Sequence, residues 1–214
     1  MKLKSDQLRT AAGPAWDAAV SHPFVRGLED GSLDEVAFRF YIRQDYLFLI
    51  DYGRLLSLGA ARAPRLADMQ KFAALALSVL ETEMDLHRTF AASWGVDDLH
   101  AVAVEPATAA YCNFLLRVAS LGDYSELAAA LLPCMWTYAE IGASLSPTSD
   151  RYQAWIEMYA SAEFAELAEW ARSIVDEVSG RIDRMSAAFT ASCEHEVRFW
   201  DAAYAAPAPR PGAA

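Results

Sequence analysis

A cysteine spaced at a helical interval from a tyrosine is the most reactive feature of this 214-residue chain. Cys134 lies in the segment LLPCMWTYAEIG, directly after Pro133, and Tyr138 follows it one helical turn later. A cysteine thiolate is a strong nucleophile, but the thiol needs a lowered pKa or a neighbouring base to form it. Most cysteines instead serve as small buried hydrophobic residues. Composition alone therefore leaves Cys134 open between a nucleophile and a core residue.

A carboxylate lies within an aromatic helix face earlier in the chain. Tyr41, Asp45, Phe48 and Tyr52 follow one another at intervals of four, three and four residues, which places them on one face of a helix. An ionised carboxylate among aromatic rings is costly unless it is paired. We expect Asp45 either to pair with Arg or Lys from another helix, or to accept hydrogen bonds from a planar ligand in a mostly apolar pocket.

The last third of the chain repeats this combination of acid and aromatic residues. Glu196 lies one turn before Phe199, and Trp155 and Tyr159 mark another aromatic stripe. Burial beside rings would raise the pKa of Glu196 into a range that suits general acid–base catalysis. The alternative is a surface glutamate that flanks a core stripe. Aromatic stripes usually belong to the core, but a buried tyrosine hydroxyl needs a hydrogen-bond partner.

Helices must position these groups, because Gly and Pro are sparse and no alternating β-branched run predicts a strand. We expect one all-α domain over residues 1–205, a helical bundle, followed by a disordered Pro/Ala-rich tail over 206–214. Asp34 is a plausible cap for the third helix. The helices are predicted at about 5–20 (bent or started late at Pro14), 23–30, 34–61, 65–93, 107–121, 124–145, 150–161, 163–179 and 181–204.

Composition excludes several classes of protein. The chain has 18 basic and 29 acidic residues, a net charge of −11, which argues against binding to nucleic acid or to an anionic membrane. No apolar run is long enough to cross a membrane, and the N-terminus lacks the apolar region of a signal peptide. Three cysteines are too few for a disulfide framework. We therefore expect a cytoplasmic protein.

Metal and cofactor signatures are weak. Glu83 and His87 are four residues apart on one predicted helix, but no Glu-x-x-His pair recurs as a di-iron bundle would require. The sequence also lacks a Gly-x-Gly-x-x-Gly motif, a phosphate-binding loop and a Gly-x-Ser-x-Gly elbow. We expect neither a metal nor a cofactor.

Taken together, the segments resemble the TenA family, also called thiaminase II, which has the haem-oxygenase-like all-α fold. The resemblance extends from about residue 5 to residue 204, and the cysteine segment and the final Glu-x-x-Phe-Trp are its most specific parts. The matching segments are His22-Pro23-Phe24-Val25 with Gly31-Ser32-Leu33, Tyr41 with Gln44-Asp45-Tyr46, Glu83 with His87, residues 132–142, Tyr152, Trp155 and Tyr159, and Glu196 with Phe199-Trp200-Asp201.

This resemblance implies an activity. Family members that keep the cysteine hydrolyse 4-amino-5-aminomethyl-2-methylpyrimidine to the hydroxymethyl pyrimidine and ammonia, and many also cleave thiamine, in thiamine salvage. By position, Cys134 would be the nucleophile that adds to the pyrimidine ring. Glu196 would exchange protons with the pyrimidine or the leaving group, and Asp45 would hold the ring nitrogen and amino group. Cys112 and Cys193 would be structural. The resemblance also implies a homotetramer.

The remaining site residues follow from the same resemblance. The predicted substrate-binding residues are Asp45, Phe48, Tyr52, Tyr111, Tyr138, Tyr159 and Phe199. Among them, Phe199 would stack on the substrate and Tyr138 could hydrogen-bond the cysteine sulfur. Phe48 departs from the family pattern, which commonly has tyrosine there. A missing hydroxyl typically costs about 0.5–1.5 kcal/mol of hydrogen bonding, so substrate preference is expected to differ.

Two other classes of function stay open. One is an oxidase on the same fold, either cofactor-free and resembling pyrroloquinoline quinone synthase or built around two iron ions. The low count of four histidines speaks against both versions. The other is a non-catalytic protein that binds pyrimidine or thiamine, or that regulates other proteins. The acidic charge gives no support to DNA contact.

Overall fold

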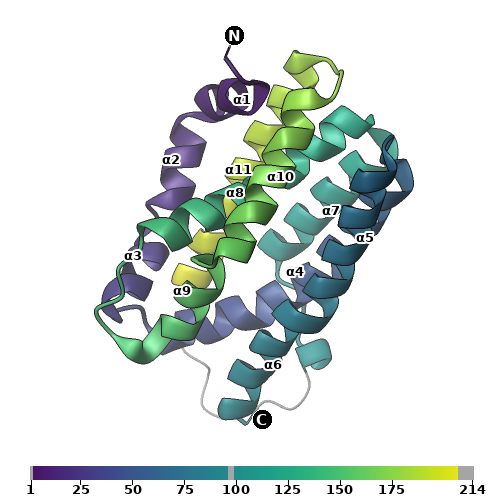
Figure 1. The fold of residues 1–214 in the computed structure, drawn as a ribbon. Helices are drawn as coiled ribbons and strands as arrows, with labels where there is room; N and C mark the ends of the chain where they lie inside the picture. The colour runs from purple at the N-terminus through teal and green to yellow at the C-terminus, as the bar shows by residue number, and fades with distance from the viewer. Residues whose placement is uncertain (1, 96–98, 207–214) are drawn as a thin grey trace.

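The computed structural model describes residues 2–95 and 99–206, and throughout these residues the chain forms helices and no strand (Figure 1). This confirms the all-α fold class. The elements, in chain order, are α1 (Lys4–Ala12), α2 (Pro14–Val20), α3 (Pro23–Asp30), α4 (Glu35–Arg62), α5 (Leu66–Ser78), a π-helical turn (Val79–Glu83), α6 (Met84–Ser93), a 3-10 turn (Leu99–Ala101), α7 (Pro106–Leu121), α8 (Tyr124–Ser144), a second 3-10 turn (Asp150–Tyr152), α9 (Gln153–Tyr159), α10 (Ala162–Glu177) and α11 (Ile182–Tyr204).

Capping side chains mark the starts of α4 and α8. The Asp34 carboxylate accepts a hydrogen bond from the backbone N–H of Val36 at 2.8 Å, as predicted for the start of α4. At the start of α8, Asp123 and Glu126 each accept a hydrogen bond from the other's backbone N–H, which makes a capping box. These local interactions fix where the two helices that carry Asp45 and Cys134 begin.

Two of the predicted helices are interrupted. The helix expected over 5–20 ends at Ala12, because Gly13 has a φ of 30° that L side chains rarely adopt, and α2 begins at Pro14. The helix expected over 65–93 contains the π-helical turn Val79–Glu83 between α5 and α6. A π turn is wider than an α turn and is often found at functional sites. It changes which side chains of this long segment point inward.

The helices pack around a central pair, α8 and α11. In Figure 1, α1 and α2 lie on one side of this pair and α4, α5 and α7 on the other, while α10 packs against α8. Helix α4 contacts α5, α7 and the π turn, and it also reaches α8 and α11. The π turn, α4, α8 and α11 therefore come close enough for their inward side chains to form one site.

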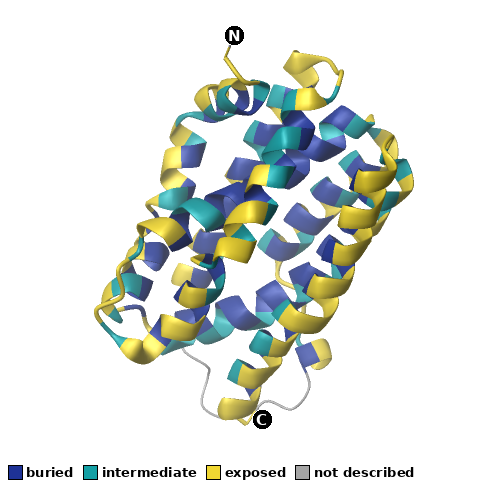
Figure 2. Ribbon diagram, viewed as in Figure 1, coloured by how far each residue is buried: buried dark blue, intermediate teal, exposed yellow. Residues whose placement is uncertain are grey.

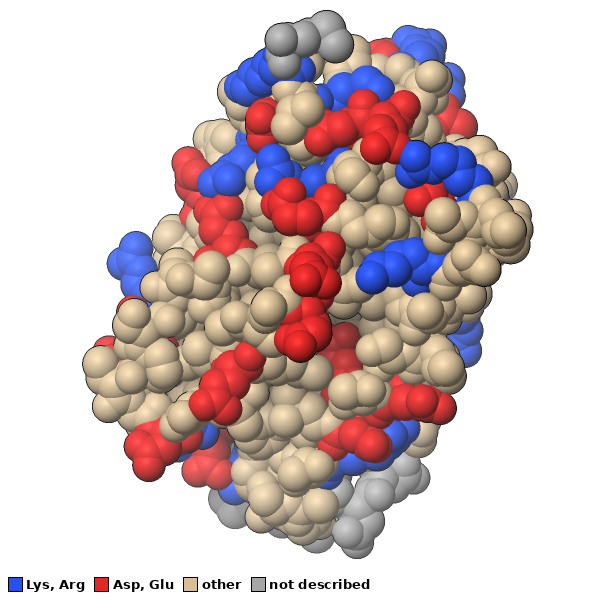
Figure 3. Space-filling model, in the orientation of Figure 1, with Lys and Arg blue, Asp and Glu red and all other residues tan. Residues whose placement is uncertain are grey.

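The interior of the bundle is rich in aromatic residues, and most of the charged residues lie outside it. Figure 2 shows buried positions along the inward faces of nearly all helices. The largest fully buried side chains include Trp16, Trp155 and Trp200. Figure 3 shows acidic side chains in a band down one face of the molecule, and α10 carries the exposed residues Glu163 and Glu166. Most of the net negative charge is thus solvated.

The C-terminal end of the predicted domain coincides with the end of the last helix. The ordered helices of the bundle extend to Tyr204, at the end of α11. The predicted disordered tail falls almost entirely on residues 207–214, which lie outside the described residues. Across the described part of the chain, no helix has both the length and the apolar character needed to cross a membrane.

Candidate active site

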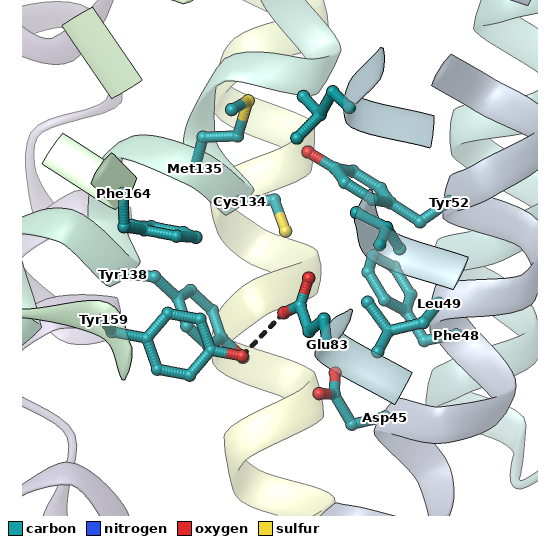
Figure 4. A pocket seen from close by; sticks show the side chains of 12 residues that line it. Asp45, Phe48, Leu49, Tyr52, Glu83, Cys134, Met135, Tyr138, Tyr159 and Phe164 are labelled. Atoms are coloured by element: carbon teal, nitrogen blue, oxygen red, sulfur yellow. Dashed lines mark hydrogen bonds between the residues drawn. The ribbon is translucent and has the colours of Figure 1, made fainter. Parts of the chain in front are cut away.

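A pocket between α4, the π turn, α8 and α9 collects most of the predicted site residues (Figure 4). The free space between these side chains is about 30 Å³. Six of the nine predicted site residues line it, and apolar side chains from α5, α8 and α10 complete the wall. The six are Asp45, Phe48, Tyr52, Cys134, Tyr138 and Tyr159. The other three, Tyr111, Glu196 and Phe199, lie behind this wall.

Cys134 differs from the other two cysteines in its access to the pocket. Cys112 and Cys193 are buried, whereas Cys134 is a partly exposed residue whose sulfur points into the pocket. Burial raises the pKa of the Cys134 thiol well above its ordinary value, and nearby carboxylates add to the rise, Glu196 most strongly. The Tyr52 hydroxyl acts in the opposite direction. The site therefore favours a thiol with an adjacent base rather than a preformed thiolate.

Glu196 is the carboxylate best placed to be that base. Only 2% of its surface is exposed, which decides between the two alternatives in favour of a buried glutamate. Burial raises its pKa to about 8, although hydrogen bonds from Tyr111 and with the Cys134 thiol act against this rise. The Tyr111 hydroxyl donates to Glu196 Oε1 at 2.6 Å and lies 2.9 Å from the Ser192 hydroxyl. This network holds the carboxyl group against the thiol from the α11 side.

Asp45 is paired, but not with the Arg or Lys side chain that its surroundings suggested. Its Oδ2 atom lies 2.7 Å from His87 Nε2 and accepts a hydrogen bond from the Tyr41 hydroxyl at 3.1 Å. Tyr41 in turn accepts from Trp155 Nε1 at 3.1 Å. The partner is instead a histidine from α6, which packs against α4. Asp45 Oδ1 has no partner among the described residues, and Asp45 lines the pocket.

The hydrogen bonds of His87 define its charge. Its Nδ1 lies 2.8 Å from the backbone carbonyl oxygen of Glu83, and its Nε2 faces the Asp45 carboxylate. Both oxygens are acceptors, so a ring that donates at both nitrogens is an imidazolium. Burial alone would disfavour this cation, but the hydrogen bond and charge of Asp45 outweigh burial and raise the pKa of His87. Asp45 and His87 therefore form a buried ion pair.

Glu83 is a pocket residue that the sequence reasoning did not identify as one. It stands at the end of the π turn, and its Oε1 atom accepts a hydrogen bond from the Tyr159 hydroxyl at 2.8 Å (Figure 4). Burial and the negative charge of Asp45 raise its pKa to about 7. The four-residue spacing of Glu83 and His87 was visible in the sequence, but it suggested only a weak metal site.

The aromatic residues divide between the pocket wall and a supporting layer. The Phe48 ring lies 5.5 Å from the Tyr52 ring and 5.0 Å from the Tyr111 ring. Phe199 lies behind Phe48, with their ring centres 6.0 Å apart. The predicted hydrogen bond from Tyr138 to the cysteine sulfur is absent among the described residues, and the Tyr52 hydroxyl is the group that faces the thiol. Tyr52 approaches from α4, across the pocket, whereas the Tyr138 ring packs against Trp155 and Tyr159 of α9.

Potential metal ligands do not gather elsewhere in the described residues. No three His, Cys, Asp or Glu side chains of the described chain are arranged to hold a metal ion together. Glu83 and His87 approach each other, but the His87 ring is hydrogen-bonded at both nitrogens and has no free lone pair to offer.

Comparisons with known proteins agree with this arrangement. Residues 9–206 match the model of the TENA/THI-4/PQQC family. An aminopyrimidine aminohydrolase of Halalkalibacterium halodurans is 42% identical over 205 residues, which cover 90% of this chain and 92% of that protein. Another protein of that name, from Bacillus subtilis, is 33% identical over 217 residues, 94% of this chain and 89% of that protein.

A solved structure supports the same assignment. A protein from Silicibacter, described as a TenA family transcription regulator, matches with a TM-score of 0.90 and 30% identity, covering 94% of this chain and 96% of that chain. More distant structures with the heme oxygenase-like fold share the bundle alone. On the family match, the sequence identity and the shared bundle, this chain belongs to the TENA/THI-4/PQQC family and has the haem oxygenase-like fold.

Proposed function

We propose that this protein hydrolyses aminopyrimidines, with Cys134 as the nucleophile. The substrate would be 4-amino-5-aminomethyl-2-methylpyrimidine, the products the hydroxymethyl pyrimidine and ammonia, and thiamine a second substrate. The observation that carries the proposal is the Cys134 thiol, which faces a pocket lined by Asp45 and has the Glu196 carboxyl group beside it. Relatives with the name aminopyrimidine aminohydrolase support the choice of reaction.

The first step uses Cys134 and Glu196. As the sulfur forms a bond to a ring carbon, Glu196 takes the proton of the thiol, and it then passes this proton to a ring nitrogen. The thiol needs no lowered pKa for this, because the base is adjacent. The raised pKa of Glu196, about 8, suits a group that first gains and then gives a proton near neutral pH.

Addition of the sulfur makes the ring electron-rich, so its electrons can expel the group on the exocyclic methylene. Water then adds to the methylene carbon, the carbon–sulfur bond breaks, and the ring nitrogen returns its proton. Asp45 would orient the ring, because its free Oδ1 oxygen can accept from the amino group while His87 and Tyr41 hold Oδ2. The Phe48 and Tyr52 rings offer apolar faces on which the pyrimidine can stack.

Ammonia release tests this proposal. Wild type and the Cys134→Ser variant are incubated with the aminomethyl pyrimidine, and ammonia and the hydroxymethyl product are measured. The variant is expected to lose essentially all turnover while it still binds the product, since serine is a much weaker nucleophile at this position. Cys112→Ser serves as the matched control and should keep its activity. Undiminished turnover in Cys134→Ser would refute the mechanism.

The same experiment separates the other classes of function. Tight pyrimidine binding without turnover by wild type would point to a binding or regulatory protein. Oxygen consumption, or stoichiometric iron in protein purified without chelator, would point to an oxidase. We favour the hydrolase because the Cys134 thiol and the Asp45 carboxylate line one pocket and the Glu196 carboxyl group lies beside the thiol.

We also propose a cytoplasmic homotetramer. Several large apolar side chains on one side of α5 and the π turn are exposed, including Leu66 at 69%, Leu77 at 57% and Leu80 at 40%. Such a surface is typical of a face that is covered by another subunit. Light scattering coupled to size-exclusion chromatography measures the assembly, and a monomer of 23.5 kDa would refute it.

A further inference from the structure

Glu83 is a pocket carboxylate for which the mechanism above has no use. Figure 4 shows its side chain between the Cys134 thiol and Asp45. Oε1 is held by the Tyr159 hydroxyl at 2.8 Å. Oε2 has no hydrogen-bond partner among the described residues and lies on the Cys134 side of the carboxyl group. A carboxyl group with one oxygen fixed and the other open to a pocket is arranged to contact a bound molecule.

The three carboxyl groups around the thiol have different partners. Asp45, on α4, is ion-paired with His87. Glu196, on α11, is hydrogen-bonded to Tyr111 and sits behind the pocket wall. Glu83, at the end of the π turn, is held by a single tyrosine hydroxyl and lines the pocket itself. Glu196 acts on the thiol and Asp45 orients the ring, whereas Glu83 has no role in the mechanism described above.

The reaction needs a proton for the leaving amine that neither Glu196 nor Asp45 supplies. An amine cannot leave carbon as an amide anion, so the nitrogen of the aminomethyl group must depart with an added proton. Glu196 already carries the thiol proton to the ring nitrogen, and Asp45 is engaged by a cation on Oδ2. The leaving nitrogen projects from the ring on an exocyclic methylene, away from the ring-nitrogen edge that Asp45 faces.

We propose that Glu83 binds the leaving amine of the substrate and supplies the proton with which it departs as ammonia. This inference rests on the aminopyrimidine hydrolysis proposed above. The carbon–nitrogen bond breaks, its electron pair stays on nitrogen, and the Glu83 carboxyl proton completes the ammonia molecule. The resulting carboxylate takes a proton from the water that adds to the methylene carbon. Glu83 is then protonated again, and no other reactant is consumed.

The surroundings of Glu83 fit this exchange. Burial and Asp45 raise its pKa to about 7, while His87 and the Tyr159 hydroxyl act to lower it, so both protonation states are accessible near neutral pH. The charged or titratable groups that face it are Asp45, His87, Tyr41, Tyr52, Tyr159 and the Cys134 thiol. Tyr159 is the positioning residue, since its hydroxyl fixes which oxygen remains open to the pocket.

Substrates with different leaving groups provide the test. The amino group of the aminomethyl pyrimidine must gain a proton to leave as ammonia, whereas the thiazole of thiamine leaves as a neutral molecule whose ring nitrogen keeps the electron pair. Glu83→Gln keeps the size of the side chain and an oxygen to accept from Tyr159, but it has no acidic proton. We expect its kcat for the aminomethyl pyrimidine to fall at least about 100-fold, the usual effect of losing a general acid. Because the thiazole leaves without a proton from Glu83, the kcat for thiamine should change by less than about threefold.

A merely structural role would lower both activities together. Equal losses on the two substrates, or no loss on the amine, would overturn the proposal. If wild type does not cleave thiamine, a trimethylammonium-methyl pyrimidine replaces it, because trimethylamine also departs without a proton. Glu81→Gln, an exposed glutamate on the same π turn, is the matched control and should match wild type. If wild type releases no ammonia at all, the proposed hydrolase fails and the role of Glu83 fails with it, which is a distinct result.

Tyr159→Phe tests the same proposal through the pH dependence of kcat, which a change in packing alone would not shift. The hydroxyl lowers the pKa of Glu83, so its removal should raise that pKa. The alkaline limb of the kcat profile for the aminomethyl pyrimidine should therefore shift to higher pH, while the profile for thiamine keeps its limb. An unshifted limb in a folded Tyr159→Phe variant would contradict the assignment.

Discussion

His87 and Asp45 form a buried ion pair, with Nε2 and Oδ2 2.7 Å apart and no exposed surface on the histidine. The second ring nitrogen of His87 is held by the Glu83 backbone carbonyl at 2.8 Å. The pair therefore links α4 to the junction of the π turn and α6. It leaves Asp45 Oδ1 available to a substrate and anchors the turn that presents Glu83.

Removing the histidine should destabilise the fold strongly. His87→Ala leaves the Asp45 carboxylate buried without a cation, and breaking such a pair typically costs about 3–5 kcal/mol. Urea unfolding measures the loss of stability. In the double variant Asp45→Asn/His87→Ala no charge is left unpaired, so we expect it to be more stable than His87→Ala alone. Equal losses in both variants would show that packing, rather than charge, explains the effect.

The Tyr52 hydroxyl should set the acidity of the nucleophile. It is buried without a hydrogen bond to another described residue, and it faces the Cys134 thiol, whose pKa it lowers. A hydrogen bond to a charged group contributes about 1.5–3 kcal/mol, which corresponds to about one to two pH units. Tyr52→Phe should therefore raise the pH midpoint of Cys134 alkylation by that amount.

The alkylation is followed by mass spectrometry with iodoacetamide over a pH series. Tyr124→Phe is the matched control, because Tyr124 also has a buried hydroxyl without a partner but lies in a different pocket. Its midpoint should equal that of wild type. A midpoint that stays in place in Tyr52→Phe would mean that the hydroxyl does not interact with the thiolate.

Glu196 should make stability fall as pH rises. Burial raises its pKa from an ordinary value of 4.5 to about 8, so the folded state binds this proton more tightly than the unfolded state does. Stability is then highest below about pH 4.5 and declines up to about pH 8, by at most about 1.4 kcal/mol per pH unit. Glu196→Gln lacks this titration and should gain stability relative to wild type across that window.

Thermal unfolding of both proteins between pH 5 and pH 9 measures the difference. Glu83 titrates in both proteins, so its contribution largely cancels in the comparison. Glu194→Gln, at an exposed position two residues earlier on α11, should follow wild type throughout. A constant offset between Glu196→Gln and wild type would contradict the raised pKa.

Phe48→Tyr should strengthen binding of the pyrimidine. Phe48 lines the pocket and is 4% exposed, so a hydroxyl added at this position would reach polar groups of the pocket or substrate. One additional hydrogen bond is worth about 0.5–1.5 kcal/mol, or a roughly 2- to 10-fold lower KM for the aminomethyl pyrimidine. Steady-state kinetics with both substrates measure it, and an unchanged KM for each would rule out a contribution from the missing hydroxyl.

Gly142 should be intolerant of any side chain. A Cβ atom there would lie 2.3 Å from the backbone carbonyl carbon and oxygen of Tyr159, where α8 and α9 meet. The backbone must move to accept Gly142→Ala, which typically costs about 1–3 kcal/mol and would displace Tyr159 from Glu83. Thermal unfolding and kcat should both fall, whereas Ala143→Ser, one exposed position further along, should change neither.

Helical spacing was enough to predict much of this site. The intervals among Tyr41, Asp45, Phe48 and Tyr52 place them on one face, and all four are buried on the inner face of α4. The caps and the low content of Gly and Pro gave the helices nearly at their observed ends, because those signals act between residues close in the chain. The resemblance to a family supplied the chemical roles, which spacing alone does not contain.

Periodicity does not say which helix faces which. The partner of Asp45 is 42 residues away in the chain, and the contact between Gly142 and Tyr159 joins two separate helices. The π turn has the same kind of sequence as the α-helices around it, and no local signal in the sequence marks the wider turn that packs against α4. Spacing within one helix follows from local geometry, whereas the meeting of Glu83, Asp45 and Cys134 depends on how all the helices pack together. For this reason the sequence shows Glu83 only as a neighbour of His87, whereas the folded chain shows that Glu83 faces the proposed reaction site.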